Sequence, residues 1–162
     1  NKPQWLTHAE HRAVWSIAEQ LGRALPGVGF GYNAYGAYAS VNHQHFQSYV
    51  LDDGHYPIED PSWTHNGGER DYPVNCRVLV DCDEAWAAIA ELHAANRPYN
   101  LLYRPGRLYL SERAFQGSYQ HADWTGGFAW SELAGSVTTF NREDFERLDD
   151  ELISAELGKL AV

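Results

Sequence analysis

In the short segment HQHFQ, two histidines and a glutamine occupy the alternate positions His43, His45 and Gln47. Side chains of an extended strand alternate between its two faces, so these three are expected on one face of a strand over residues 41–51. Buried polar groups cost free energy unless they have partners. Three polar side chains in such a row therefore indicate a metal site, a solvated face or a ligand site.

A metal site would use the two histidines as its first ligands, because His-x-His on a strand is a common ligand pair. The remaining ligands would have to come from scattered residues without a telling spacing, namely His55, Glu59, Asp60 and His65. We expect no metal and no cofactor. A solvated face is disfavoured by the small residues of the preceding loop, which let backbone approach a ligand closely. These are Gly31, Asn33, Gly36 and Ser40.

Nucleophilic catalysis at phosphorus is the third interpretation. A neutral imidazole nitrogen is a good nucleophile at neutral pH, and a phosphorylated histidine is a labile intermediate. The flanking histidine and glutamine would donate hydrogen bonds to phosphate oxygens as negative charge grows there. Ser40 and Asn42 would add further donors from the preceding loop.

The elements that position these residues follow from periodicity and from helix and turn signals. Thr7 and Glu10 form a capping box after a connecting segment, and predict a helix at about 8–25. Strands are predicted at 28–33, 41–51, 77–80 and 136–140, a hairpin at 99–110, a polar loop at 52–71, and further helices from Asp83 to about Asn96 and from Asn141 to about Leu157. Adjacent strands with short links favour an antiparallel sheet packed with helices, which is the α+β class.

Length, composition and net charge disfavour several classes of function. The 162 residues suit one domain, and 44% of them are hydrophobic, which suffices for a core. The formal net charge of −10 disfavours nucleic-acid binding. No run of eighteen apolar residues indicates a membrane span, so we expect no membrane partner. Cys76 and Cys82 are expected to be buried thiols, which favours a cytoplasmic setting.

Residues 31–49, GYNAYGAYASVNHQHFQSY, resemble the histidine-triad (HIT) superfamily in its transferase branch, where the motif is His-x-His-x-Gln. The nearest pattern is that of the GDP-hexose phosphorylases, typified by the GDP-L-galactose phosphorylases. Four further stretches resemble the same group, so the likeness covers most of the chain. They are PQWLT, HYPIED, RPYNLLYRPGRLYLSERAFQG and FAWSELAGSVTTFNREDFE.

The resemblance implies a role for each residue. His45 would attack the α-phosphorus, and His43 and Gln47 would hold the phosphate. The residues expected to line the ribose and phosphate side are Asn33, Ser40 and Asn42, with Arg113, Glu59 and His55 as further candidates. The substrate would be a nucleoside diphosphate sugar or a dinucleotide, and inorganic phosphate would accept the nucleotide. Alternatives are an Ap4A-type dinucleoside polyphosphate phosphorylase, a sugar-1-phosphate nucleotidylyltransferase, or a nucleotide-binding module with a vestigial site.

The chain also departs from this group. A Gly-His pair of the family is Gly135-Ser136 here, and Arg104 and Arg107 are expected to be solvated at a hairpin turn. The N-terminal half of the family's fold has no counterpart in the sequence, which starts with Asn and contains no Met. We therefore expect residues 1–162 to be a single HIT-like domain, the C-terminal part of a longer phosphorylase. It would form a homodimer or associate with the missing N-terminal segment.

Overall fold

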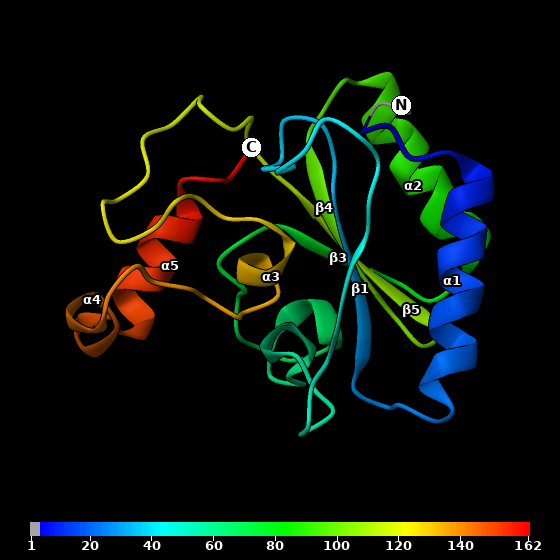
Figure 1. The fold of residues 1–162 in the computed structure, drawn as a ribbon, viewed down its shortest axis with the longest axis horizontal. Coiled ribbons are helices and arrows are strands. Elements are labelled where there is room, and N and C mark those ends of the chain that lie inside the picture. The colour runs from blue at the N-terminus through cyan, green and yellow to red at the C-terminus, as the bar shows by residue number, and fades with distance from the viewer. Residues whose placement is uncertain (1–3) are drawn as a thin grey trace.

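The chain folds around one five-stranded antiparallel sheet, which confirms the α+β class (Figure 1). The computed structural model describes residues 4–162, so the first three residues of the expected connecting segment lie outside the described part. The spatial order of the strands is β2-β1-β4-β5-β3. Their bounds are β1 Val28–Asn33, β2 Gln47–Val50, β3 Cys76–Leu79, β4 Tyr99–Arg104 and β5 Arg107–Glu112.

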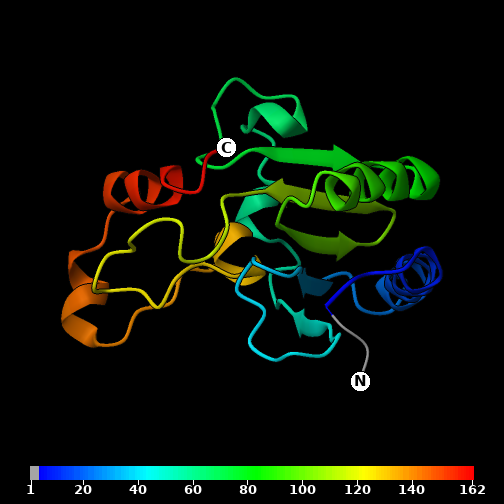
Figure 2. The same ribbon diagram turned by 90° about the horizontal axis from the view of Figure 1, so that it is seen from above.

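Helices lie on both faces of this sheet (Figures 1 and 2). Two long helices, α1 (His8–Gly22) and α2 (Cys82–Ala94), cover one face. The other face carries short elements: the 3-10 turn η1 (Pro57–Glu59), the 3-10 turn η2 (Thr64–Asn66) and α3 (Trp130–Leu133). The C-terminal helices α4 (Arg142–Arg147) and α5 (Asp150–Gly158) lie beyond α3, away from α1 and α2. None of the described helices is long and apolar enough to cross a membrane.

Alternation along the central strands produces the two faces. In β4, Leu101 and Tyr103 belong to the core cluster beneath α1 and α2, whereas Leu102 belongs to the opposite cluster with Trp130 of α3. β5 follows the same rule, and its Tyr109 faces Trp130. Because successive strand side chains point to opposite faces, both faces of these central strands are buried.

Local signals correctly predicted the start of α1 and the β4–β5 hairpin, whereas α1 ends at Gly22 and not near the predicted residue 25. The side chain of Thr7 accepts a hydrogen bond from the Glu10 backbone, and the reciprocal bond of the capping box is present. The hairpin turn has Pro105 followed by Gly106, whose positive φ of 71° suits the second central position of a type II turn. At α2 the prediction was wrong by two residues, because Asp81 rather than Asp83 caps the helix.

The predicted strand over residues 41–51 is present only at its end, as β2. β2 is also an edge strand, paired with β1 from Val28↔Val50 to Gly31↔Gln47. Residues 41–46 are irregular because their polar groups find other partners: the Gln4 side chain donates to the carbonyl oxygens of Val41 and His43. Phe46 turns inward against Tyr32 and Tyr103.

Two predictions near the C-terminus were wrong. Residues 136–140 form no strand: the Ser136 N–H bonds the Ser131 carbonyl oxygen, and Thr138 donates to Glu132. The expected final helix is split into α4 and α5, because a second helix cap stands at Asp149. Its side chain accepts from the Leu152 N–H at 2.8 Å, just as Asn141 caps α4. Likewise, the predicted 52–71 loop contains both 3-10 turns.

His11 of α1 is fully buried between the helices and the sheet. Its Nδ1 lies 2.8 Å from the Tyr103 hydroxyl and its Nε2 lies 2.9 Å from the Cys82 carbonyl oxygen. Burial, which disfavours the charged imidazolium, lowers the pKa of His11 below its ordinary value of 6.5. The folded protein therefore holds this imidazole neutral where the unfolded chain would already protonate it.

This burial predicts a pH-dependent stability. Between the lowered folded-state pKa and the unfolded value of about 6.5, the unfolded chain binds more protons, so the free energy of unfolding should fall as the pH decreases through this window. Urea unfolding at pH 7.5 and 5.5 should show a larger loss in wild type than in His11→Gln. The exposed His55→Gln variant should keep the wild-type loss. Equal losses in wild type and His11→Gln would contradict the prediction.

Candidate active site

The two motif histidines lie side by side just before β2, and of the three motif residues only Gln47 belongs to the strand. The rings of His43 and His45 are 5.9 Å apart between centroids. His43 is exposed, whereas His45 and Gln47 are half-buried. The two imidazoles are thus neighbours beside the strand end, but an irregular segment, and not the predicted strand alternation, brings them together.

One ring nitrogen of His45 faces the protein. Its Nδ1 lies 3.1 Å from the carbonyl oxygen of His43. A carbonyl oxygen can only accept, whereas the Gln4 amide nitrogen, which lies 2.9 Å from the same Nδ1, can only donate, so the two contacts favour opposite tautomers of His45. In either tautomer, Nε2 is the ring nitrogen that has no hydrogen-bond partner among residues 4–162. With the proton on Nδ1, this Nε2 carries the lone pair and is the nucleophilic nitrogen.

Gln4 contacts the motif, and no signal in the sequence indicated a role for it. Its side chain is almost completely buried, and its Nε2 lies 2.9 Å from both the Val41 carbonyl oxygen and the His45 Nδ1. It also donates to the His43 carbonyl oxygen. Gln4 Oε1 has no hydrogen-bond partner among the described residues. The residue ties the segment before α1 to the motif loop, a contact between positions 41 residues apart that no local pattern reveals.

Gln47 contacts a second residue without a predicted role. The indole Nε1 of Trp130 donates to Gln47 Oε1 at 2.8 Å. Trp130 stands at the start of α3 and packs over Gly31, where a Cβ atom would lie only 1.9 Å from the indole ring. Gly31 therefore makes room for this indole, and not for a ligand as its small size indicated in the sequence.

Asn33 lies inside the protein, although the sequence placed it on the ligand side of the loop. Its Oδ1 accepts from Asn100 Nδ2 at 2.6 Å and from the Trp130 backbone N–H at 2.8 Å. Asn100 also donates to the Ala37 carbonyl oxygen at 2.9 Å. Asn33 of β1 is thus hydrogen-bonded to β4 and α3 inside the protein. Through Trp130 of α3, it supports Gln47 of the motif.

Arg113 is also interior, contrary to the expected contact with phosphate. Its side chain is fully buried and donates to the Phe128 carbonyl oxygen and, at 2.6 Å, to the Tyr119 hydroxyl. Its guanidinium lies 5.0 Å from the ring centroid of Tyr38. Burial lowers the pKa of Arg113 from its ordinary value. These bonds stabilise the segment after β5, because they connect Arg113 at its start with Tyr119 and Phe128 further along it.

Ser40 and Asn42 lie in the same loop, and both are exposed. They line a cavity of about 550 Å³ that Gln4 also borders. Its wall includes two aromatic side chains, Tyr35 and Phe115, whose ring centroids are 6.5 Å apart in an edge-on arrangement. Gln4 borders this cavity and also contacts His45, so one side chain connects the cavity with the nucleophile candidate.

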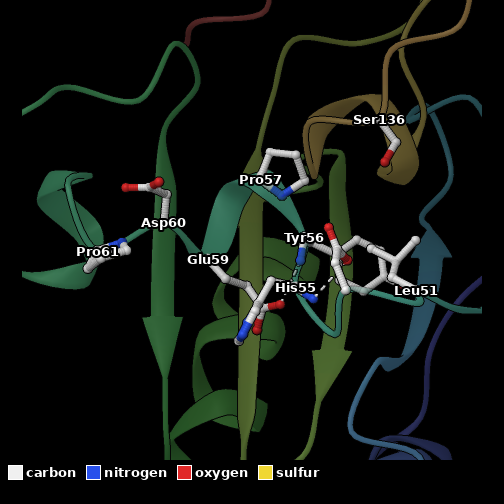
Figure 3. A pocket seen from close by; sticks show the side chains of 9 residues that line it. Leu51, His55, Tyr56, Pro57, Glu59, Asp60, Pro61 and Ser136 are labelled. Carbon is white, nitrogen blue, oxygen red and sulfur yellow. Dashed lines mark hydrogen bonds between the residues drawn. The ribbon is translucent and has the colours of Figure 1, made fainter.

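His55 and Glu59 lie at a second cavity, of about 560 Å³ (Figure 3). Most of its wall comes from residues 51–61, and Ser136 reaches it from the segment after α3. The two cavities share no lining residue among those described. His55 and Glu59 are therefore gathered apart from Ser40 and Asn42.

Glu59 forms a buried ion pair with Arg104. The prediction that Arg104 is solvated at the hairpin turn was therefore wrong. Arg104 Nε lies 3.0 Å from both carboxylate oxygens, and its other nitrogens donate to the carbonyl oxygens of Val28, Pro26 and Gly54. Its side chain is 5% exposed and that of Glu59 is 11% exposed. The guanidinium is drawn into the protein because the Glu59 carboxylate and three backbone carbonyl oxygens together supply five acceptor contacts to it. Arg107, in contrast, is exposed as expected.

The candidate metal ligands are not gathered into one site. Among residues 4–162, no three His, Cys, Asp or Glu side chains form a group that could hold a metal ion. His65 Nε2 instead lies 2.8 Å from the Ile58 carbonyl oxygen, and Asp60 accepts from the Ser62 N–H. Burial raises the pKa of Cys76 to about 12, and both cysteines are free thiols.

Known structures share this architecture. Yeast Ap4A phosphorylase Apa2 in complex with Ap4A superimposes with a TM-score of 0.74 over 99% of this chain and 67% of that chain, at 16% sequence identity. Its complex with AMP gives a TM-score of 0.72 over 98% of this chain and 65% of that one, at 19% identity. The chain therefore has the histidine-triad-like fold, as the motif resemblance implied.

A similarity in sequence also supports this resemblance. GDP-L-galactose phosphorylase 2 of Arabidopsis thaliana is 27% identical over 175 aligned positions, which cover 92% of this chain. The chain spans 40% of that protein's length. No protein-family model matches the sequence.

Proposed function

We propose that this chain carries the nucleotidyl-transfer site of a phosphorylase that cleaves a GDP-hexose, or a related nucleoside diphosphate compound, with inorganic phosphate. The observation that supports this most directly is the geometry of His45, whose Nδ1 contacts Gln4 and the His43 carbonyl oxygen while its Nε2 has no partner among residues 4–162. The tautomer with its proton on Nδ1 would present the Nε2 lone pair to a substrate. The names of both relatives, a GDP-L-galactose phosphorylase and an Ap4A phosphorylase, agree with this chemistry.

The reaction would proceed in two displacements. In the first, His45 Nε2 attacks the α-phosphorus, a P–N bond forms, and the P–O bond to the leaving sugar phosphate breaks with its electron pair going to that phosphate. In the second, an oxygen of inorganic phosphate attacks the same phosphorus and the P–N bond breaks. The nucleoside diphosphate leaves, and neutral His45 is restored.

His43 and Gln47 would stabilise the charge that develops on the α-phosphoryl oxygens in both displacements. A glutamine at position 47 can donate a hydrogen bond but cannot exchange a proton with water near neutral pH. This favours transfer to a phosphate acceptor over hydrolysis. Ser40 and Asn42 would contact the nucleotide from the first cavity, which both residues line.

A dinucleoside polyphosphate is the second candidate substrate, because the fold matches an Ap4A phosphorylase along nearly the whole chain. The test supplies the full-length protein with a GDP-hexose or Ap4A, each with and without phosphate, and identifies products and intact mass. The proposal expects a nucleoside diphosphate only when phosphate is present, and a nucleotidyl adduct on the protein when it is absent. Hydrolysis in the absence of phosphate, or no adduct with any substrate, would overturn it.

We further propose that the site is completed by association, either with a second copy or with an N-terminal part of a longer phosphorylase of which residues 1–162 are the C-terminal domain. The edge strand β2 leaves Tyr49 54% and Val50 50% exposed, and unpaired strand edges invite association. Light scattering of the full-length protein should give a dimer or a single larger chain. A monomer of this domain alone, active without a partner, would contradict the proposal. The two free cysteines support a reducing, cytoplasmic setting.

A further inference from the structure

The carboxamide of Gln47 is held in one orientation by a neighbouring indole. Trp130 Nε1 can only donate a hydrogen bond, and it lies 2.8 Å from Gln47 Oε1. The opposite orientation of the carboxamide would place its NH₂ group against the indole N–H, so that two donors would face each other. The indole therefore selects one of the two amide orientations.

This selection decides what Gln47 can offer to a ligand. With Oε1 occupied by the indole, the group that is available is Nε2, which has no partner among residues 4–162. Nε2 is a donor, and the oxygens of an ionised phosphoryl group are acceptors. If the amide turned over, Oε1 would face those oxygens and repel them. An amide fixed before the substrate arrives does not have to be reoriented in the transition state.

Trp130 is itself rigidly held. Its backbone N–H donates to Asn33 Oδ1 at 2.8 Å, and its side chain is 2% exposed. Its ring lies over Gly31, with Tyr49 at 5.6 Å and Tyr56 at 6.2 Å between ring centroids. The indole is thus a fixed reference for Gln47.

We propose that Trp130 is a positioning residue for phosphoryl transfer, which holds the Gln47 carboxamide so that Nε2 faces the α-phosphoryl oxygens. The inference rests on the proposed nucleotidyl transfer and adds to it a residue that does not touch the substrate. Its effect should appear in the rate of the chemical step, because an aligned donor matters most where charge is largest.

The first test is Trp130→Phe in the full-length protein, which keeps an aromatic ring but removes the indole N–H. We expect kcat for nucleotidyl transfer to fall about tenfold, the worth of one neutral hydrogen bond, while KM changes by less than about threefold. The matched control is Trp124→Phe. That tryptophan is also buried, but it belongs to the C-terminal core cluster and should leave kcat within about twofold.

A double-substitution cycle separates positioning from general loosening of the structure. If Trp130 acts through Gln47, then Trp130→Phe should have less than about a twofold effect on kcat once Gln47→Ala is present. A structural role alone would lower kcat by the same factor in both backgrounds. Equal factors would overturn the inference.

A spectroscopic readout covers the case in which Trp130→Phe does not fold. The chain has six tryptophans, each with one indole N–H resonance. With ¹⁵N-labelled tryptophan, Gln47→Ala should shift the Trp130 indole resonance and speed its exchange with solvent, and should leave that of Trp124 unchanged. An unchanged Trp130 resonance would overturn the inference.

The outcomes distinguish this inference from the proposed function. If wild type forms no nucleotidyl adduct with any substrate, the proposed function fails and the inference fails with it. If wild type is active but Trp130→Phe is as fast as Trp124→Phe, the proposed function stands and the positioning role of Trp130 is refuted.

Discussion

His45→Ala is expected to abolish nucleotidyl transfer. In the proposed mechanism His45 forms the covalent bond to the α-phosphorus, so removing its imidazole deletes the reaction path and does not merely raise its barrier. Turnover of a GDP-hexose or Ap4A with phosphate should fall to background in the full-length protein. The acid-labile, base-stable nucleotide adduct that wild type accumulates without phosphate should be absent from the mass spectrum of the variant.

The neighbouring motif residues serve as controls for this result. His43→Ala and Gln47→Ala should each remove one donor to the phosphoryl group and lower kcat by about 10²–10³, with the adduct still detectable. Circular dichroism should show that all three variants are folded. If folded His45→Ala kept turnover comparable to that of Gln47→Ala, His45 would not be the nucleophile, and a binding module or metal-dependent chemistry would have to be considered again.

Arg104→Met is expected to destabilise the protein by about 3–5 kcal/mol, the cost typical of breaking a buried ion pair by removing one partner. The variant leaves the Glu59 carboxylate, 11% exposed, without its counter-ion. It also strands the carbonyl oxygens of Pro26 and Gly54, which now accept from the guanidinium. Urea unfolding followed by circular dichroism measures the loss.

Two variants make this test specific. Arg107→Met lies across the same hairpin turn but is exposed, and should change the free energy of unfolding by no more than about 0.5 kcal/mol. Adding Glu59→Gln to Arg104→Met should restore part of the loss, because it removes the stranded charge. A loss below about 1 kcal/mol for Arg104→Met would show that the pair contributes little.

Local signals accounted for much of the fold. The capping box at Thr7 and the Pro105-Gly106 turn each depend on residues within four positions of one another, so sequence alone was sufficient to place them. The split between α4 and α5 was missed although it is also local. The cap at Asp149 stands inside an otherwise helical pattern, and its strength against helix continuation cannot be judged from periodicity.

The site was predicted only in part, because its supports are distant in sequence. The His-x-His-x-Gln motif predicts the roles of His43, His45 and Gln47, and the structure places the two imidazoles side by side. Gln4 and Trp130, which contact His45 and Gln47, are separated from them by 41 and 83 positions. No local sequence pattern near Gln4 or Trp130 predicts those contacts.

Burial also reversed several interpretations of polar residues. Asn33, Arg104 and Arg113 were expected near ligand or solvent, and all three are interior. Every guanidinium nitrogen of Arg104 and Arg113 has a hydrogen-bond partner, and the Oδ1 of Asn33 accepts two hydrogen bonds, which is the condition under which such groups can be buried. Composition indicates that a residue is polar, but only the tertiary structure supplies the partners that decide where it lies.

The close packing of the Trp130 indole on Gly31 has a consequence for how sequences with this fold can change in evolution. A Cβ atom at position 31 would lie 1.9 Å from the indole, so a side chain there and a tryptophan at position 130 exclude each other. The two positions should therefore covary: a relative with alanine or serine at 31 must carry a smaller residue at 130. Such a relative would lack the indole donor and would need another way to orient residue 47. An alignment of relatives, sorted by the residue at position 31, would thus divide them by how they hold the last residue of the motif.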